Sequence, residues 1–373
     1  MAIISLGKLD KSLIPIIIGC IFCFFDRLLN QFDGTLLFSN AILSNIVFSF
    51  ARFFAIIPYI IVKIRTKNSI KEQASFKNND NNVELIVTYN KIIKTQIKYI
   101  IIASLILFIQ SLSFVISFDI KTSSWILYIL FSSVFYYFIF KEKFYRHHFL
   151  SIVLIILIGF IIDLITGNLI DDFKNNLLIL LLRFTTELIF SFHNVFAKFI
   201  MEKKYVSVYL FLFIDSVINL ILLSIVAIID YNFIGFYDYS EYFNSFNSTE
   251  LLVILGEIAT QFGFFIFLFI TIKNKTPSHA FILFVFGQFA YIYSSGITVI
   301  VFVCLFLILF LCLVIIEVIE INFCGLSYNI KRNIILRANI EASGSYFLNR
   351  ESMDERSESS ISLSNMKDDE IYN

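Results

Sequence analysis

Apolar residues dominate the sequence in long runs that are separated by short polar segments. A run of about 20 apolar residues forms a helix of about 30 Å, which matches the hydrocarbon core of a bilayer. About ten membrane-spanning helices are therefore expected. They lie at residues 13–31, 34–62, 99–118, 124–140, 149–164, 181–198, 205–229 and 251–272, with two more in the uncharged run 280–316, which is divided at Ser294-Ser295-Gly296.

This pattern predicts an all-α fold, a polytopic membrane bundle with polar segments before, between and after its helices. Residues 1–12 are expected to form a cytoplasmic N-terminus and residues 13–166 a first group of five helices. Within that group, the polar, asparagine-rich residues 66–96 are typical of a flexible connector. A polar break at 167–176 leads into a second group of five helices, residues 175–320. The serine-rich and charged residues 321–373 are expected to be a disordered cytoplasmic tail.

The composition supports membrane insertion and excludes a nucleic-acid partner. Hydrophobic residues make up 58% of the chain and charged residues only 16%, whereas soluble domains average about 45–50% and 25%. The 29 basic and 29 acidic residues cancel, so the chain lacks the excess positive charge that nucleic-acid binding requires. The bilayer is the expected surrounding partner.

The distribution of positive charge predicts the orientation of the helices. Lysine and arginine accumulate in the short cytoplasmic loops of membrane proteins. If both termini are cytoplasmic, the basic residues fall in cytoplasmic segments with five exceptions, which are Arg27, Arg52, Lys121, Lys174 and Arg183. The chain is therefore expected to be a multi-pass protein with both termini in the cytoplasm, while the choice between plasma membrane and endomembranes stays open.

The run at 181–198 carries a polar stripe. Its members follow one another at steps of four, four, three and four and share one helical face; they are Arg183, Glu187, Ser191, Asn194 and Lys198. A polar stripe inside the membrane must face protein or water. Because His193 and Lys198 fall toward the cytoplasmic boundary, we expect them to be anchors at the membrane interface.

Several other predicted helices carry polar residues at similar depths, and together they suggest a central polar cavity that binds a solute. The main candidates are Arg52, Arg183, Glu187, Asp215, Asn219, Glu257 and Gln261. Secondary candidates are Asn45, Gln110, Gln288 and Tyr291. The alternative interpretation is that the arginines and carboxylates only pair with each other and hold the bundle together.

The sequence offers little support for an enzyme. It contains no Walker A loop, no G-x-S-x-G and no G-x-G-D motif. The four histidines are scattered along the chain, at positions 147, 148, 193 and 279, so no multi-histidine metal site is expected. We therefore expect no catalytic residues, no metal and no cofactor.

Residues 132–164 carry a resemblance to a known superfamily. A helix rich in small residues is followed by the short loop Lys141-Glu142-Lys143 and by an apolar helix with Gly159 toward its end. This pattern resembles the fourth and fifth helices of the drug/metabolite transporter superfamily, which includes EamA-like and solute-carrier-35-like carriers. The resemblance implies two five-helix repeats of inverted topology around a central cavity. Sugar-phosphate members carry basic residues in their last two helices, whereas residues 280–316 have none.

Together these features predict a secondary transporter that moves a small polar or amphipathic solute by alternating access. Whether a proton or a counter-substrate is coupled to it, and the oligomeric state, stay open. The alternative is a non-transporting membrane scaffold or receptor that acts through its serine-rich tail.

The predicted topology can be tested through glycosylation. Asn247-Ser248-Thr249 is an acceptor motif in a loop that is expected to be extracytoplasmic. Glycosidase treatment of the expressed protein should increase its gel mobility, and Asn247→Gln should abolish that shift. A shift that survives this substitution would contradict the predicted topology.

Overall fold

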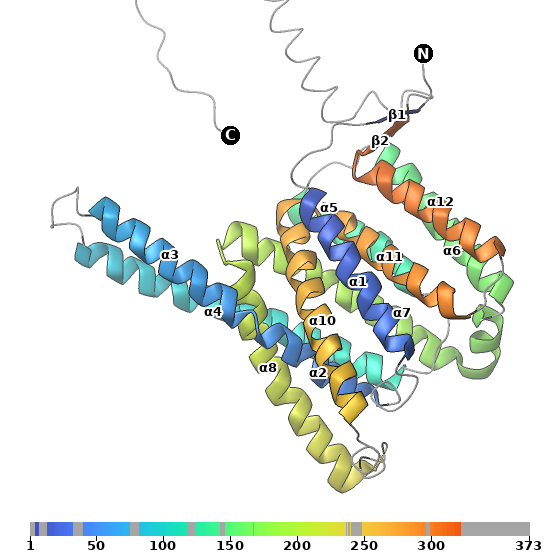
Figure 1. Cartoon of the computed structure of the whole chain (residues 1–373), viewed down its shortest axis with the longest axis horizontal. Helices are drawn as coiled ribbons and strands as arrows, with labels where there is room; N and C mark the ends of the chain where they lie inside the picture. Colours follow the sequence, from blue (N-terminus) through green and yellow to red (C-terminus); the bar gives the residue numbers. More distant parts are fainter. Residues whose placement is uncertain are drawn as a thin grey trace, which may run out of the picture. The chain divides into compact units, whose positions relative to one another are not determined.

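A computed structural model describes most of the chain as helices (Figure 1). The described residues are 4–6, 13–32, 40–74, 82–117, 124–141, 146–166, 168–235, 237, 239, 248–295 and 299–321. The chain divides into two compact units, of which residues 5–320 form the larger and contain every helix below. Two three-residue strands, β1 (Ile4–Leu6) and β2 (Ile319–Ile321), pair with each other.

The helices follow one another with short connections. The first half contains α1 (Ile14–Phe32), α2 (Ala41–Phe53), α3 (Ile56–Ala74), α4 (Asn82–Ile116), the 3-10 turn η3 (Ser124–Ile126), α5 (Leu127–Phe140) and α6 (Arg146–Thr166). The second half contains α7 (Asn168–Lys203), α8 (Val208–Ile229), the π-turn η4 (Asp230–Ile234), α10 (Ser248–Asn274), α11 (Pro277–Ser295) and α12 (Val299–Ile315).

The all-helical fold class is confirmed, and the length and composition of several helices are compatible with a membrane protein. Among the described residues, six helical segments are long and apolar enough to cross a bilayer: 41–65, 96–116, 146–166, 177–203, 208–234 and 251–274. Three shorter apolar helices lie at 127–140, 277–290 and 299–315. The run 280–316 divides where expected, because α11 ends at Ser295 and α12 begins at Val299. A total of ten crossings stays a prediction.

Helices extend further into polar sequence than expected. The predicted connector 66–96 is helical up to Ala74 and again from Asn82. The predicted break at 167–176 is wrong for residues 168–176, which form the first turns of α7. Composition marks where a helix leaves an apolar environment, and backbone hydrogen bonding can continue past that point. Asn247 and the tail beyond residue 321 lie outside the described residues.

A break separates α2 from α3 four residues before Pro58. Proline has no N–H and cannot donate to the carbonyl of the residue four positions earlier, which here is Phe54. That carbonyl instead accepts from the N–H of Ile57 at 3.0 Å. The break leaves Arg52 in the last turn of α2.

Helix α1 has one exposed side and one buried side. Ile14, Ile17, Ile21 and Phe25 are exposed, at helical steps of three and four. The opposite side is buried and contains Leu13, Ile16, Cys20 and Cys23. Both sides are apolar, and Ile17, Ile21 and Phe25 of the exposed side line part of a cavity.

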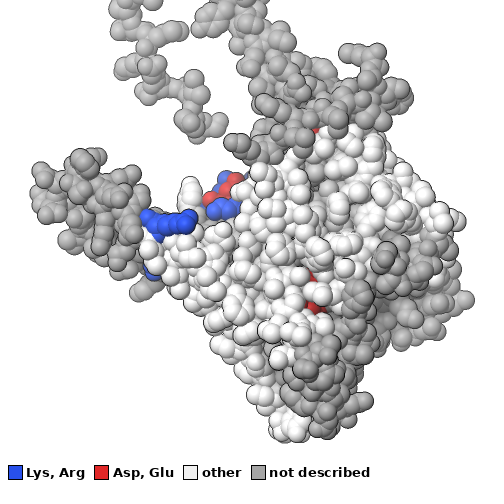
Figure 2. Space-filling model, in the orientation of Figure 1, with Lys and Arg blue, Asp and Glu red and all other residues white. Residues whose placement is uncertain are grey.

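The helices of the two halves pack mainly against each other. α1 contacts α10 and α11, and α7 contacts α4 and α5 (Figure 1). α2 contacts α8 and α10, while α4 also contacts α8. α5 contacts α11, and α6 contacts α12. Charged side chains are sparse on the described part of the face in Figure 2, as expected for a surface surrounded by lipid.

Close packing between α1 and its neighbours depends on glycine. A Cβ atom at Gly19 would lie 2.7 Å from Leu283 Cδ2 of α11 and 3.1 Å from Phe267 Cβ of α10. The Phe267 Cβ is fixed to its backbone, so α1 could not keep its present distance from α10. Small residues at such interfaces allow transmembrane helices to approach closely.

We therefore expect Gly19→Ala to lower the free energy of unfolding by about 1–3 kcal/mol, because an extra methyl group would overpack this interface. The measurement is the thermal unfolding midpoint of the detergent-solubilised protein. Gly256→Ala is the control, since its nearest neighbour would be Leu29 at 3.4 Å, an ordinary contact. Equal midpoints for the two variants would contradict this interpretation.

Candidate functional site

A buried ion pair joins the two halves of the chain. Arg52, in the last turn of α2, donates from Nη1 to Oδ2 of Asp215 on α8 at 2.6 Å. The side chains are 6% and 0% exposed. The pair is therefore shielded from solvent. In such a buried setting the attraction between opposite charges is much stronger than in water.

Neighbouring groups fix both members of the pair. Arg52 Nη2 donates to Ser49 Oγ at 2.9 Å, and its guanidinium carbon lies 5.1 Å from the centre of the Phe265 ring of α10. Asn219, one turn after Asp215, donates to Asp215 Oδ1 at 3.3 Å. Each charge therefore has a second polar or aromatic contact besides its partner, as buried charges require.

A histidine from a third helix completes this group. His193 on α7 is buried, and its Nε2 lies 3.9 Å from Asp215 Oδ1, a distance too long for a hydrogen bond. We refer to Arg52, Asp215, Asn219, His193 and Ser49 as the Arg52–Asp215 cluster. Its members come from α2, α7 and α8, with Phe265 of α10 beside it.

The structure thus unites three of the main candidates, Arg52, Asp215 and Asn219. Glu257 is fully buried on α10, and Gln261 one turn later donates to Asp26 Oδ1 of α1 at 2.5 Å. Arg183 lies over Phe114 of α4, with its guanidinium carbon 4.6 Å from the ring centre. It also interacts electrostatically with Glu187 and with Arg27 of α1.

The secondary candidates have more local surroundings. Asn45 donates to the Ala41 carbonyl within its own helix at 2.8 Å. Gln110 and Gln288 are partly buried. The side chain of Tyr291 lies outside the described residues.

Among the buried polar residues that were not predicted site residues, Asp26 and His193 lie beside predicted ones. Asp26 continues the protein-facing side of α1, three residues after Cys23, and this spacing could have revealed it. His193 was expected to be an interface anchor, which is wrong because its ring is buried beside Asp215. His193 shares a helical face with the buried Ala197 and Ile200, and that pattern could have indicated burial.

The expectation that Lys198 anchors the membrane interface is also wrong. Lys198 is buried, and its Nζ donates to the carbonyls of Ile272, Lys273 and Lys275 at 3.2, 3.1 and 2.6 Å. These carbonyls lie at the C-terminal end of α10. A positive charge at a helix C-terminus satisfies carbonyls that have no partner within the helix and interacts favourably with the helix dipole.

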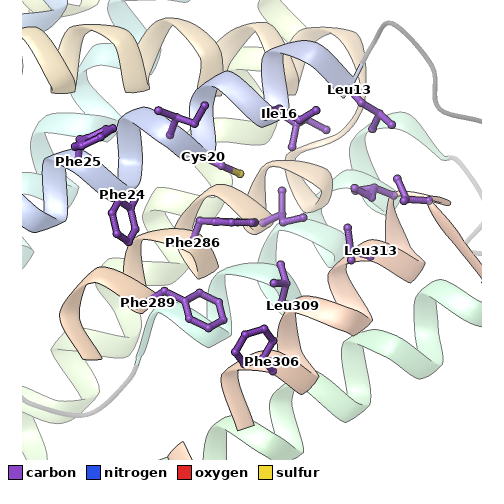
Figure 3. A pocket seen from close by; sticks show the side chains of 15 residues that line it. Leu13, Ile16, Cys20, Phe24, Phe25, Phe286, Phe289, Phe306, Leu309 and Leu313 are labelled. Carbon is purple, nitrogen blue, oxygen red and sulfur yellow. The ribbon is translucent and has the colours of Figure 1, made fainter. Parts of the chain in front are cut away.

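The cavity in Figure 3 has a different character from the Arg52–Asp215 cluster. It has a volume of about 560 Å³, and apolar side chains of α1, α11 and α12 line most of it. They include Phe24, Phe286, Phe289, Phe306 and Leu309. None of its described lining residues is a predicted site residue. A cavity of this composition favours an apolar chain over a charged solute.

No protein-family model matches the chain, and no curated protein is significantly similar to it in sequence.

The role of Lys198 can be tested by substitution. Lys198→Met keeps the apolar stem but removes the charge that caps α10, and we expect the free energy of unfolding to fall by about 1–2 kcal/mol. The measurement is the thermal midpoint in detergent. Lys203→Met is the matched control on the same helix, because Lys203 is exposed. The capping role is contradicted if both variants retain the midpoint of the unsubstituted protein.

Proposed function

We propose that the chain is a secondary transporter that moves a small polar or amphipathic solute across a membrane by alternating access. The proposal builds on a coarser finding, a protein whose long apolar helices are suited to a membrane. The pattern of contacts between its two halves carries the proposal.

The most extensive of those contacts repeat when each apolar segment is exchanged with the one five positions later in the chain. In chain order the segments are α1, α2 with α3, α4, α5 and α6, followed by α7, α8, α10, α11 and α12. The packing of α1 on α10 and α11 then corresponds to that of α7 on α4 and α5. The α2–α10 contact corresponds to the α8–α4 contact. The exchange leaves three pairs unchanged, because each joins a segment to its own counterpart: α2–α8, α5–α11 and α6–α12.

Such exchange symmetry supports two structural repeats. If each half crosses the membrane five times, the odd number gives the second half the opposite orientation, which is the inverted repeat of many secondary transporters. The resemblance of residues 132–164 to the drug/metabolite transporter superfamily points in the same direction. In such folds solute sites lie near the middle of the membrane, between the repeats.

The origin of the Arg52–Asp215 cluster in both halves of the chain supports this proposal. Arg52 belongs to the first half of the chain, whereas Asp215, Asn219 and His193 belong to the second. A movement of one half against the other would strain the ion pair, and a polar solute that replaces one partner would compensate for its loss. Charged groups within the membrane are costly, and they commonly mark the pathway of a solute or a proton.

The same ion pair also favours the rival interpretation, a non-transporting scaffold or receptor. Arg52 and Asp215 neutralise each other in a buried setting, and a pair of this kind can serve only to join helices. In that case the serine-rich residues 321–373 would carry the activity. The two functions differ in what happens when both charges are removed together.

The double variant Arg52→Leu/Asp215→Leu distinguishes them. Arg52→Leu alone leaves a buried carboxylate without its partner and should cost about 3–5 kcal/mol of stability, whereas removal of both charges is often neutral. The double variant should therefore retain the thermal midpoint of the unsubstituted protein.

Uptake into proteoliposomes would be measured with labelled amino acids, monosaccharides, nucleosides and organic cations.

We expect the unsubstituted protein to accumulate one class of these solutes and the double variant to fall to the level of empty vesicles. Lys203→Met, which changes an exposed charge, should transport normally. Uptake by a stable double variant at the normal rate would limit the ion pair to a structural role. Failure of the unsubstituted protein to accumulate any class would favour the scaffold.

A further inference from the structure

Three residues of types that commonly bind metal ions lie close together at the ends of α6 and α12. None of them belongs to the Arg52–Asp215 cluster. His147 and His148 occupy the first turn of α6, and Glu317 directly follows α12. One ligand atom from each of the three lies within 4.8 Å of the others. His147 Nε2 and Glu317 Oε1 are 3.8 Å apart. The histidines are scattered along the sequence, but the fold brings His279 near His147 and His148.

The fold brings these residues together through the packing of α6 along α12. At the end of α12 the chain reverses in a Schellman motif, in which Val318 N donates to the Leu313 carbonyl at 3.0 Å and Glu317 N to the Val314 carbonyl at 3.1 Å. Glu317 occupies the left-handed position of this motif, with φ of 59°. The turn holds the Glu317 carboxylate beside the start of α6.

The spacing of the three side chains suits a small divalent ion. Zinc binds imidazole nitrogen and carboxylate oxygen at about 2.0–2.2 Å, so tetrahedral ligands lie about 3.4 Å from each other. The observed separations exceed this value by at most about 1.4 Å, which side-chain rotation can supply. The His147 and His148 rings have centres 4.2 Å apart and cross at 68°, so they do not stack face to face.

The surroundings fit a zinc site in two further respects. His147 is buried, whereas the side chain of Glu317 is 29% exposed and provides a route for the ion. His279 at the start of α11 lies next to the group, with its ring centre 6.2 Å from that of His148. Its Nδ1 lies 2.6 Å from Thr276 Oγ1, which orients the ring.

We propose that His147, His148 and Glu317 bind a Zn²⁺ ion that joins the beginning of α6 to the end of α12. Imidazole ligands favour zinc and its neighbouring transition metals over magnesium and calcium, which prefer oxygen. Three protein ligands leave a fourth position for water. The ion would fix the turn at Glu317 that follows α12. The proposal is independent of transport.

The test uses the full chain in detergent, purified through a tag that contains no histidine. Visible absorption during titration with Co²⁺, followed by displacement with Zn²⁺, measures binding to the site. We expect one equivalent to bind and the thermal midpoint to rise by several degrees, because an ion that binds only the folded state stabilises it. His147→Gln/His148→Gln should weaken binding at least about tenfold. His193→Gln, a histidine of another helix, is the control.

Glu317→Gly separates a metal ligand from a purely structural turn residue. Glycine suits the left-handed position, so this variant should be more stable than the unsubstituted protein in a chelator, yet it should lose most of the stabilisation by zinc. Lys141→Gly is the matched control, because Lys141 ends α5 at φ of 58° and is not among the proposed ligands. It should keep the full response to zinc.

Two results would overturn the proposal. The first is no binding to the unsubstituted protein beyond that of the double-histidine variant, which would mean an adventitious ion only. The second is an equal rise in midpoint with zinc for the unsubstituted protein and Glu317→Gly.

Discussion

The cost of placing charge in an apolar environment governs the interior of this protein. Arg52 and Asp215 offset this cost by forming an ion pair between the two halves of the chain. Ser49, Asn219 and Phe265 provide further contacts to the pair. Asp26 offsets the same cost through Gln261. Each solution requires a partner on another helix or a neighbouring turn, so the polar residues restrict which helices can be neighbours.

Apolar packing supplies the complementary restriction. Lipid is as apolar as the side chains it surrounds, so contact with lipid does little to drive helices together, and close fit must do so instead. Gly19 allows α1 to approach both α10 and α11 at once. Phe22 stacks on Phe267 in the same region, with ring centres 5.8 Å apart. Close packing therefore holds α1 against α10 and α11 in this region, while an ion pair joins α2 to α8.

The helices themselves could be predicted because a membrane demands long apolar runs, and this demand is local in sequence. The division of 280–316 and the start of α11 at Pro277 follow from local rules of the same kind. The Arg52–Asp215 pair could be predicted in part from the sequence, since both residues interrupt apolar runs at similar depths. His193 and Lys198 were misjudged because depth along a helix does not tell which neighbour covers a given side. Glu317 follows His147 and His148 by about 170 residues, and it meets them through the packing of α6 on α12.

The contact of Lys198 with three carbonyls at the end of α10 has a mechanical consequence. Separation of α7 from α10 at that end would take the Lys198 ammonium away from these carbonyls, and it would keep Glu202 of its own helix as an ion-pair partner at 3.2 Å. Lys198 therefore joins α7 to the C-terminal end of α10. We expect such a joint to act as a pivot, so that any relative motion of α7 and α10 is smallest at Lys198 and grows with distance from it.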